Sequence, residues 1–97
     1  MKYRLTLSPE AEKTIRQLAP DLKRKIRFAL EEIQEDPYLG KPLKDELKGL
    51  RSYRVHHYRI VYRIHHHQIE IQVIDIGPRS LIYDRVVAAI RIQGGGR

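Results

Sequence analysis

Hydrophobic and polar residues follow two different periods along this chain. Alternation of apolar and polar residues predicts a half-buried strand, whereas apolar residues at i, i+3, i+4 and i+7 predict an amphipathic helix. The chain opens with an alternating stretch, residues 1–7, and continues with two helical patterns that meet at Pro20. Ser8 is a suitable N-cap for the first helix. Pro20 ends that helix and opens the second, which we expect to end at residue 35.

The second half of the chain predicts three more strands and one more helix. A loop with turn-forming glycine and proline residues comes first, over residues 38–49. Residues 76–78, Ile-Gly-Pro, interrupt the last alternating stretch before helical spacing resumes. The predicted strands cover residues 50–55, 58–64 and 69–75, their turns lie at residues 56–57 and 65–68, and the helix covers residues 80–92.

This β-α-α-β-β-β-α order predicts a single α+β domain over residues 1–93. We expect an N-terminal strand and an antiparallel helical hairpin packed on one face of a small, mostly antiparallel four-stranded sheet. The C-terminal helix then lies at the edge of the sheet or on its other face. Residues 94–97, Gly-Gly-Gly-Arg, predict a flexible tail.

Composition narrows the chemistry that the domain can perform. The chain has no cysteine, which excludes disulfides, a thiolate nucleophile and cysteine zinc ligands. It has no apolar run of about 20 residues, the length that a membrane span needs. We therefore expect a soluble, cytoplasmic protein. The net charge of +7 favours a nucleic acid or an acidic protein as the partner.

The net positive charge is concentrated in the second half, and above all in residues 51–63. That stretch contains no acid, whereas residues 51–97 hold eight of the 19 Lys and Arg residues and three of the 12 Asp and Glu residues. If a hairpin turns at His56 and His57, Arg54 lies directly opposite Arg59. Like charges in such a pair repel by about 0.2–1 kcal/mol, so the arrangement suits a sheet that faces phosphate. The alternating tyrosine and aliphatic residues then face the helices, while Arg54, Arg59 and Arg63 face away.

A second cationic element follows at the start of the predicted C-terminal helix. Arg79 lies at or just before the helix start, where free backbone amides and the helix dipole also favour an anion. Tyr83 is four residues further on and therefore one turn along the same side. We expect Arg79 and Tyr83 to form a wall opposite Arg54 and Arg59.

Structural interpretations of the same residues remain open. Arg54 and Arg59 also suit a solvated sheet face, and His56 and His57 also suit a simple turn. Three consecutive histidines at 65–67 resemble a metal cluster, but on a strand they alternate in direction and no nearby acid or cysteine completes a site. We therefore interpret them as turn residues and expect neither a metal nor a cofactor.

Three segments together resemble the RelE/ParE toxin superfamily of bacterial and archaeal toxin–antitoxin modules. They are Leu-x-Gly-Leu-x-x-Tyr-Arg-Val at 47–55, Tyr-Arg-Ile-Val-Tyr at 58–62 and Ile-Gly-Pro-Arg-x-x-x-Tyr at 76–83. The resemblance covers about residues 2–92 and includes the predicted order of elements. The sequence departs from the best-known RelE toxins in having Arg54 and His56 where they have lysine, and in a shorter turn after Val55.

The resemblance implies a ribosome-dependent endoribonuclease that cleaves messenger RNA in the ribosomal A site. Attack by an RNA 2′-hydroxyl on its own 3′-phosphate needs no metal. The implied catalytic set is Arg54, His56, Arg59, Arg79 and Tyr83, with the arginines stabilising phosphoryl charge. Histidine, whose ordinary pKa is about 6.5, is the side chain suited to accept the 2′-proton. We expect His57 and Arg63 to contact RNA beside this set.

The resemblance also implies partners and leaves two alternative functions. The partners are the ribosome, messenger RNA and a cognate antitoxin, which is acidic and partly helical. We expect the toxin and the antitoxin to form a hetero-oligomer, and we expect no membrane partner. One alternative is a ParE-like inhibitor of DNA gyrase. The other is a non-catalytic module that binds an antitoxin or nucleic acid.

Overall fold

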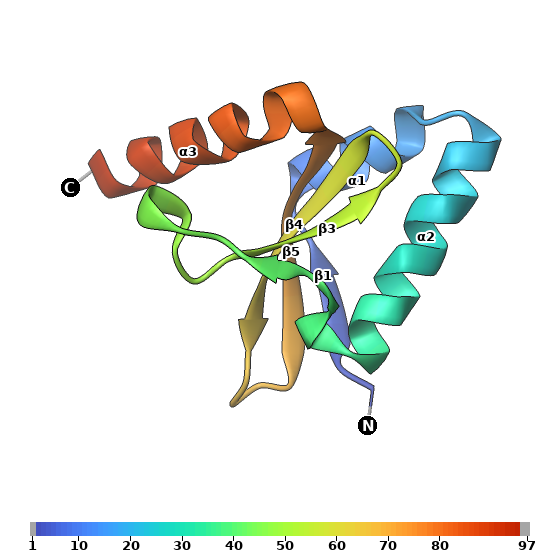
Figure 1. Cartoon of the computed structure of the whole chain (residues 1–97), viewed down its shortest axis with the longest axis horizontal. Helices are drawn as coiled ribbons and strands as arrows, with labels where there is room; N and C mark the ends of the chain where they lie inside the picture. Colours follow the sequence, from blue (N-terminus) through green and yellow to red (C-terminus); the bar gives the residue numbers. More distant parts are fainter. Residues whose placement is uncertain (1, 96–97) are drawn as a thin grey trace.

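One five-stranded sheet lies between helices on both of its faces (Figure 1). The computed structural model describes residues 2–95, with side chains to residue 92. The strand order is β1-β5-β4-β3-β2, in which β1 and β5 are parallel and all other neighbours are antiparallel. The strands are β1 (Arg4–Leu7), β2 (Lys41–Pro42), β3 (Arg51–Val55), β4 (Tyr58–His65) and β5 (Glu70–Pro78).

Helices α1 (Pro9–Gln17) and α2 (Pro20–Glu35) cover one face of the sheet. The Ser8 side chain accepts a hydrogen bond from the Ala11 amide, so the predicted N-cap is confirmed. One apolar stripe on each helix packs against the inward residues of β3, β4 and β5. The fully buried residues of this core are Ala11, Ile26, Ile33, Ile60, Tyr62, Ile71, Val73 and Ile76.

Helix α3 (Arg79–Gly95) covers the opposite face, which is the second of the two positions predicted for it. Ile82 and Val86 of α3 pack with Val61, Leu50 and Leu47 in a smaller core. The helix includes residues 94 and 95 of the predicted tail, and residues 96 and 97 lie outside the described part of the chain. No helix within residues 2–95 has the length and hydropathy of a membrane span.

The α+β class, the order of the predicted elements and the hairpin register are confirmed. Val55 pairs with Tyr58, Arg54 with Arg59, Tyr53 with Ile60 and Ser52 with Val61. The inward residues of β3 and β4 pack on the α1–α2 side, as the alternation predicts. The register is fixed because a slip of one residue would turn every apolar side chain to the wrong face.

Two parts of the sheet differ from the prediction. The break predicted at residues 76–78 is wrong, because β5 continues to Pro78 and pairs Gly77 with Arg59. Pro78 is tolerated because it is the last residue of β5, where β4 is the only neighbouring strand within the described residues. Between Val61 and Tyr62 the register shifts by one residue, so Ile74 is the bulged residue of β5. The fifth strand, β2, lies within the predicted loop; it is only two residues long and contains Pro42, so it has no periodicity to detect. Two short 3-10 turns, η1 (Pro37–Leu39) and η2 (Asp45–Leu47), flank it.

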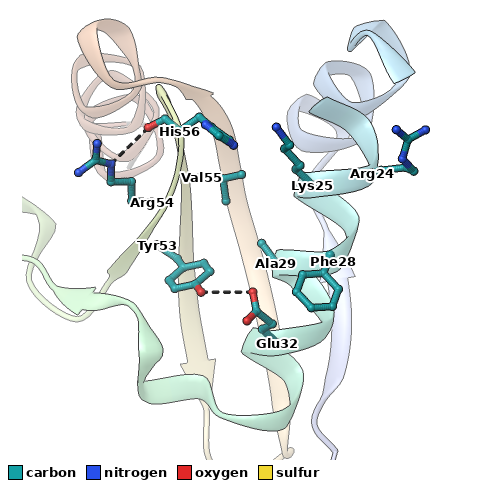
Figure 2. A pocket seen from close by; sticks show the side chains of 9 residues that line it. All are labelled: Arg24, Lys25, Phe28, Ala29, Glu32, Tyr53, Arg54, Val55 and His56. Atoms are coloured by element: carbon teal, nitrogen blue, oxygen red, sulfur yellow. Dashed lines mark hydrogen bonds between the residues drawn. The ribbon is translucent and has the colours of Figure 1, made fainter. Parts of the chain in front are cut away.

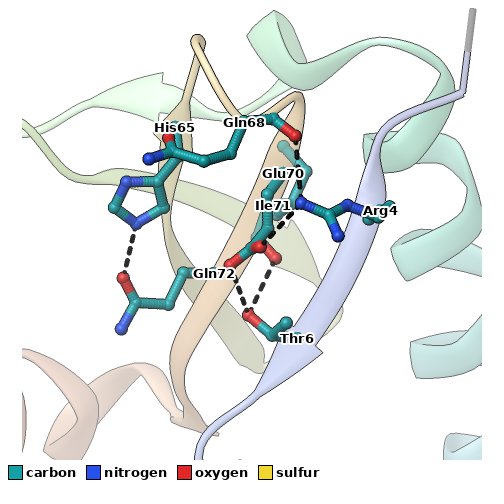
Figure 3. A network of polar contacts seen from close by, with 7 residues as sticks. All are labelled: Arg4, Thr6, His65, Gln68, Glu70, Ile71 and Gln72. Atoms are coloured by element: carbon teal, nitrogen blue, oxygen red, sulfur yellow. Dashed lines mark hydrogen bonds and ion pairs between the residues drawn. The ribbon is translucent and has the colours of Figure 1, made fainter.

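Polar side chains cross-link the strands at the end of the sheet far from the start of α3 (Figure 3). On β1, Thr6 donates a hydrogen bond to Glu70 of β5, and Arg4 forms an exposed ion pair with the same carboxylate. His65 hydrogen-bonds to Gln72 through Nε2 at 2.7 Å. The first residue of the His65–His67 run is thus engaged in pairing β4 with β5.

The hydroxyl of Tyr62 holds the segment that carries β2. This side chain is fully buried; it donates to the Pro37 carbonyl at 2.6 Å and accepts from the Gly40 amide at 2.9 Å. Burial is the main cause of the raised pKa of Tyr62, so the hydroxyl remains protonated and can donate. A Cβ on Gly40 would lie 2.6 Å from this oxygen, so only glycine fits there.

We predict that Tyr62→Phe lowers the free energy of unfolding by about 1–3 kcal/mol, because a buried amide and a buried carbonyl lose their partner. Urea denaturation measures this change. The control is Tyr58→Phe, since no hydrogen bond to the Tyr58 hydroxyl occurs within the described residues, and we expect a change within about 0.5 kcal/mol. Equal effects of the two substitutions would contradict the anchoring role.

Asp75 and Arg85 fasten α3 to the sheet. Asp75 is 6% exposed and accepts two hydrogen bonds from the Arg85 guanidinium, at 2.7 and 2.9 Å, and one from the Ile76 amide. Gly77 provides room for Arg85, because a Cβ there would lie 3.1 Å from a guanidinium nitrogen.

We predict that Asp75→Asn lowers the free energy of unfolding by about 1–3 kcal/mol, since the bonds to a charged group are lost in a mostly buried site. Thermal or urea unfolding provides the measurement. The comparison variant is Glu46→Gln, which removes the exposed pair with Arg91 on the same helix and should have little effect. If Asp75→Asn were as harmless as Glu46→Gln, the pair would not be what holds α3 in place.

Candidate functional site

Four of the predicted site residues line one groove on the α3 side of the sheet. Arg54 is near the end of β3, Arg59 is near the start of β4, and Arg79 and Tyr83 lie on the first two turns of α3. The groove has a volume of about 460 Å³. Lys41 of β2 also lines the groove, so side chains from four elements, β2, β3, β4 and α3, converge here.

The extension of β5 positions Arg79 beside the strand arginines. Pairing of Gly77 with Arg59 and of Pro78 with Tyr58 carries the chain to the tip of the β3–β4 hairpin. The Arg79 amide then donates to the His57 carbonyl at 2.8 Å. The predicted second wall therefore forms, and it is held by backbone bonds at the hairpin turn.

The groove is cationic and its cations are not neutralised by the protein. The residues that line it include Lys41, Arg54, Arg59 and Arg79 and no acid. Within residues 2–95, none of these four makes an ion pair. Arg54 and Arg59 donate only long bonds, of 3.4 and 3.3 Å, to backbone carbonyls of the hairpin. Most of their donors remain available to an anion, for which guanidinium groups offer a planar fork.

Tyr83 is oriented by a residue that the sequence analysis did not select. Its hydroxyl lies 2.9 Å from the hydroxyl of Ser52, which is 8% exposed and lines the same groove. Ser52 has the same strand parity as Arg54, and this signal was available from the sequence. Lys41 offered no such signal, because β2 is too short to show alternation. Lys41 pairs with Ser52, so the edge strand brings a fourth cation beside Tyr83.

His56 lies apart from this groove. The turn gives it a φ of +56°, the positive φ that a two-residue hairpin requires at its first central position. Its ring points toward α2, on the opposite side of the hairpin from the Arg54 guanidinium (Figure 2). The predicted role of His56 as a base therefore stays a prediction, and it requires RNA at the tip of the hairpin.

Neither of the two residues predicted to contact RNA lines the groove itself. His57 lines a shallow surface with Pro78, Arg79 and Ser80, next to the groove at the start of α3. Arg63 lies with Glu10 and His65 at a different hollow, under the C-terminal part of α3. Within the described residues, no group of three or more His, Asp or Glu side chains has the arrangement of a metal site.

Comparison with curated proteins finds two toxins. Toxin RelE of Mycobacterium tuberculosis (strain ATCC 25618 / H37Rv) is 36% identical over 59 residues, which is 60% of this chain and 61% of that protein. The match thus spans less than two thirds of that relative. Toxin RelG of the same organism is 31% identical over 87 residues, which is 88% of this chain and 100% of that protein.

Solved structures of toxins share the fold. The RelBE2 toxin–antitoxin complex of M. tuberculosis contains a chain that matches with a TM-score of 0.74 and 27% identity, over 81% of this chain and 100% of that chain. The isolated E. coli RelE toxin matches with a TM-score of 0.70 and 25% identity, over 91% of this chain and 98% of that chain. The family model described as the ParE toxin of the type II toxin–antitoxin system parDE matches residues 5–83. The chain therefore belongs to the ParE toxin family, within the RelE/ParE superfamily.

Proposed function

We propose that this chain is the toxin of a RelBE-type toxin–antitoxin module and that it cleaves messenger RNA in the ribosomal A site. The observation that carries the proposal is the groove in which Arg54, Arg59, Arg79 and Lys41 gather beside Tyr83 without any acid. Such a groove suits a phosphate, and RNA presents a phosphate next to a 2′-hydroxyl. The curated relatives at 36% and 31% identity carry the name RelE or RelG toxin, which supports this branch.

In the proposed reaction the 2′-oxygen attacks the adjacent phosphorus and the bond to the 5′-oxygen breaks. The 2′-hydroxyl loses its proton and the departing 5′-oxygen gains one, so the products are a 2′,3′-cyclic phosphate and a 5′-hydroxyl end, and no metal is required. The guanidinium groups stabilise the charge that develops on the phosphoryl oxygens, a contribution that commonly reaches about 100-fold or more for each donor. Tyr83, held by Ser52, orients or stacks on the RNA.

Proton transfer is the part of the reaction for which the groove is least equipped. Arginine is a poor base because it stays protonated, and no histidine lines the groove. His56 is our candidate for accepting the 2′-proton when the RNA reaches the hairpin tip. A site with strong electrostatics and few acid–base groups benefits from an external element that orients the substrate, which agrees with dependence on the ribosome in the cytoplasm.

The partner that would restrain the toxin is a cognate antitoxin. Solved neighbours include toxins in complex with antitoxins, among them RelBE2 of M. tuberculosis. With a net charge of +7 on this chain, we expect an acidic, partly helical antitoxin in a hetero-oligomer.

The second candidate function is inhibition of DNA gyrase. It is favoured by the family model, whose description is the ParE toxin of parDE. The two candidates differ in target, so one induced culture separates them. In-frame cleavage of translated messages supports the RNase, whereas loss of supercoiling with intact messages supports the gyrase inhibitor and contradicts our proposal.

We predict that the double substitution Arg79→Ala with Tyr83→Phe lowers the rate of messenger cleavage by about 100-fold or more, because a charge-stabilising donor and an orienting hydroxyl are removed. Mapping of messenger 5′ ends after induction, and a ribosome-programmed cleavage assay, measure the loss. The control Arg16→Ala removes an exposed arginine of α1 and should leave the rate unchanged. Unchanged toxicity of the double variant would place the site elsewhere.

We predict that His56→Gly distinguishes a structural role of His56 in the hairpin turn from a role in proton transfer. Glycine accepts positive φ without strain, so the free energy of unfolding should stay the same or rise by up to about 1 kcal/mol. If His56 accepts the 2′-proton, the single-turnover cleavage rate falls by about 100-fold. A stable variant that cleaves at the wild-type rate would show that the histidine serves only the turn.

A further inference from the structure

A second hollow lies between α2 and the tip of the β3–β4 hairpin (Figure 2). Its volume is about 490 Å³. Ala29 of α2 and Val55 of β3 form an apolar floor, and Tyr53 closes one end by donating a hydrogen bond to Glu32 at 3.3 Å. Burial, and then the neighbouring Glu32 carboxylate, raise the pKa of Tyr53, so its hydroxyl stays protonated.

The mouth of this hollow brings basic groups together from opposite walls. Lys25 on α2 and His56 on the hairpin point toward one another (Figure 2), and Arg24 lies on the same helix. Glu32 is the one acid among the lining residues, and it is engaged by Tyr53. Arg24 pairs with Asp21, but both side chains are highly exposed, so the pair is readily exchanged for another anion. The arrangement favours an anionic ligand.

The backbone conformation at His56 determines which way its ring points. The two-residue turn requires a positive φ at its first central position, where His56 has a φ of +56°. This backbone conformation directs the imidazole of His56 toward Lys25 and away from the Arg54 guanidinium.

Phe28 adds an aromatic surface to the same mouth. Its side chain is 63% exposed, although a phenylalanine is normally buried. An exposed ring among cations has the composition of a nucleotide site, in which a base stacks on the ring while its phosphate meets the basic groups.

Arg54 connects this hollow to the groove, since it lines both. We infer that the hollow is a second nucleotide subsite: single-stranded RNA crosses the hairpin tip from the groove, its phosphate lies between Lys25 and His56, and its base stacks on Phe28. The inference rests on the proposed function, because the groove must hold RNA first. It also brings RNA to the hairpin tip, where His56 would need it.

The test compares the affinity of full-length protein for a dinucleotide and a hexanucleotide of 2′-O-methyl RNA, which cannot be cleaved. Fluorescence anisotropy at several salt concentrations provides the dissociation constants. We expect Phe28→Leu to weaken binding of the hexanucleotide by about fivefold or more, with no change in salt dependence. Lys25→Ala should lower the slope of log K against log salt by about 0.7, the value for one phosphate of a single strand. Neither variant should affect the dinucleotide.

The control Lys13→Ala removes an exposed lysine of α1 and should change neither affinity nor slope. Lys25 and Phe28 are exposed, so both variants should unfold at the wild-type temperature. Hexanucleotide binding that is unchanged in both variants overturns the subsite, even if Arg79→Ala still weakens both oligonucleotides. If Arg79→Ala affects neither oligonucleotide, the proposed function of the groove is what fails.

Discussion

The pairing of β3 with β4 through a two-residue turn sets Arg54 opposite Arg59, and the site depends on that register. Two guanidinium groups on neighbouring strands repel one another, so the arrangement survives because the opposite face of the same strands is firmly packed. Ile60 and Tyr62 are fully buried against α2, and a register slip would expose both. The packing of the hydrophobic core thus holds Arg54 and Arg59 close together, although their charges alone would keep them apart.

The strand arginines become a groove only because two other segments are brought to them. Helix α3 is held at its start by the Arg79–His57 backbone bond and further along by Asp75 and Arg85. The β2 edge is held by Tyr62, and the Gly40 carbonyl also accepts a bond from Arg51 at 2.6 Å. Tyr62 therefore serves both the core and the site, since its ring packs against the helices and its hydroxyl fixes the strand that presents Lys41.

The periodicity of the sequence predicted the strands and helices in which apolar and polar residues recur at regular spacing. Alternation over residues 51–63 gave the hairpin, its register and the outward direction of Arg54 and Arg59, and the four-residue spacing placed Arg79 and Tyr83 on one side of a helix. Features that depend on one or two residues leave no periodic pattern, so the sequence did not predict them. The continuation of β5 through Gly77 and Pro78 depends on pairing with β4, and β2 depends on the Tyr62 hydroxyl. Neither partner is close in sequence.

The direction of the His56 ring could not be predicted from periodicity for the same reason. A turn residue follows neither period, and its direction is set by φ, which is +56° here. The consequence is that the basic hairpin serves two faces: the arginines face α3, and His56 faces α2. Arg54 borders both hollows, so an RNA strand on the path that we propose would leave the groove beside His56, where Lys25 and Phe28 lie. The proposed path would pass Arg54, His56 and Lys25 in turn.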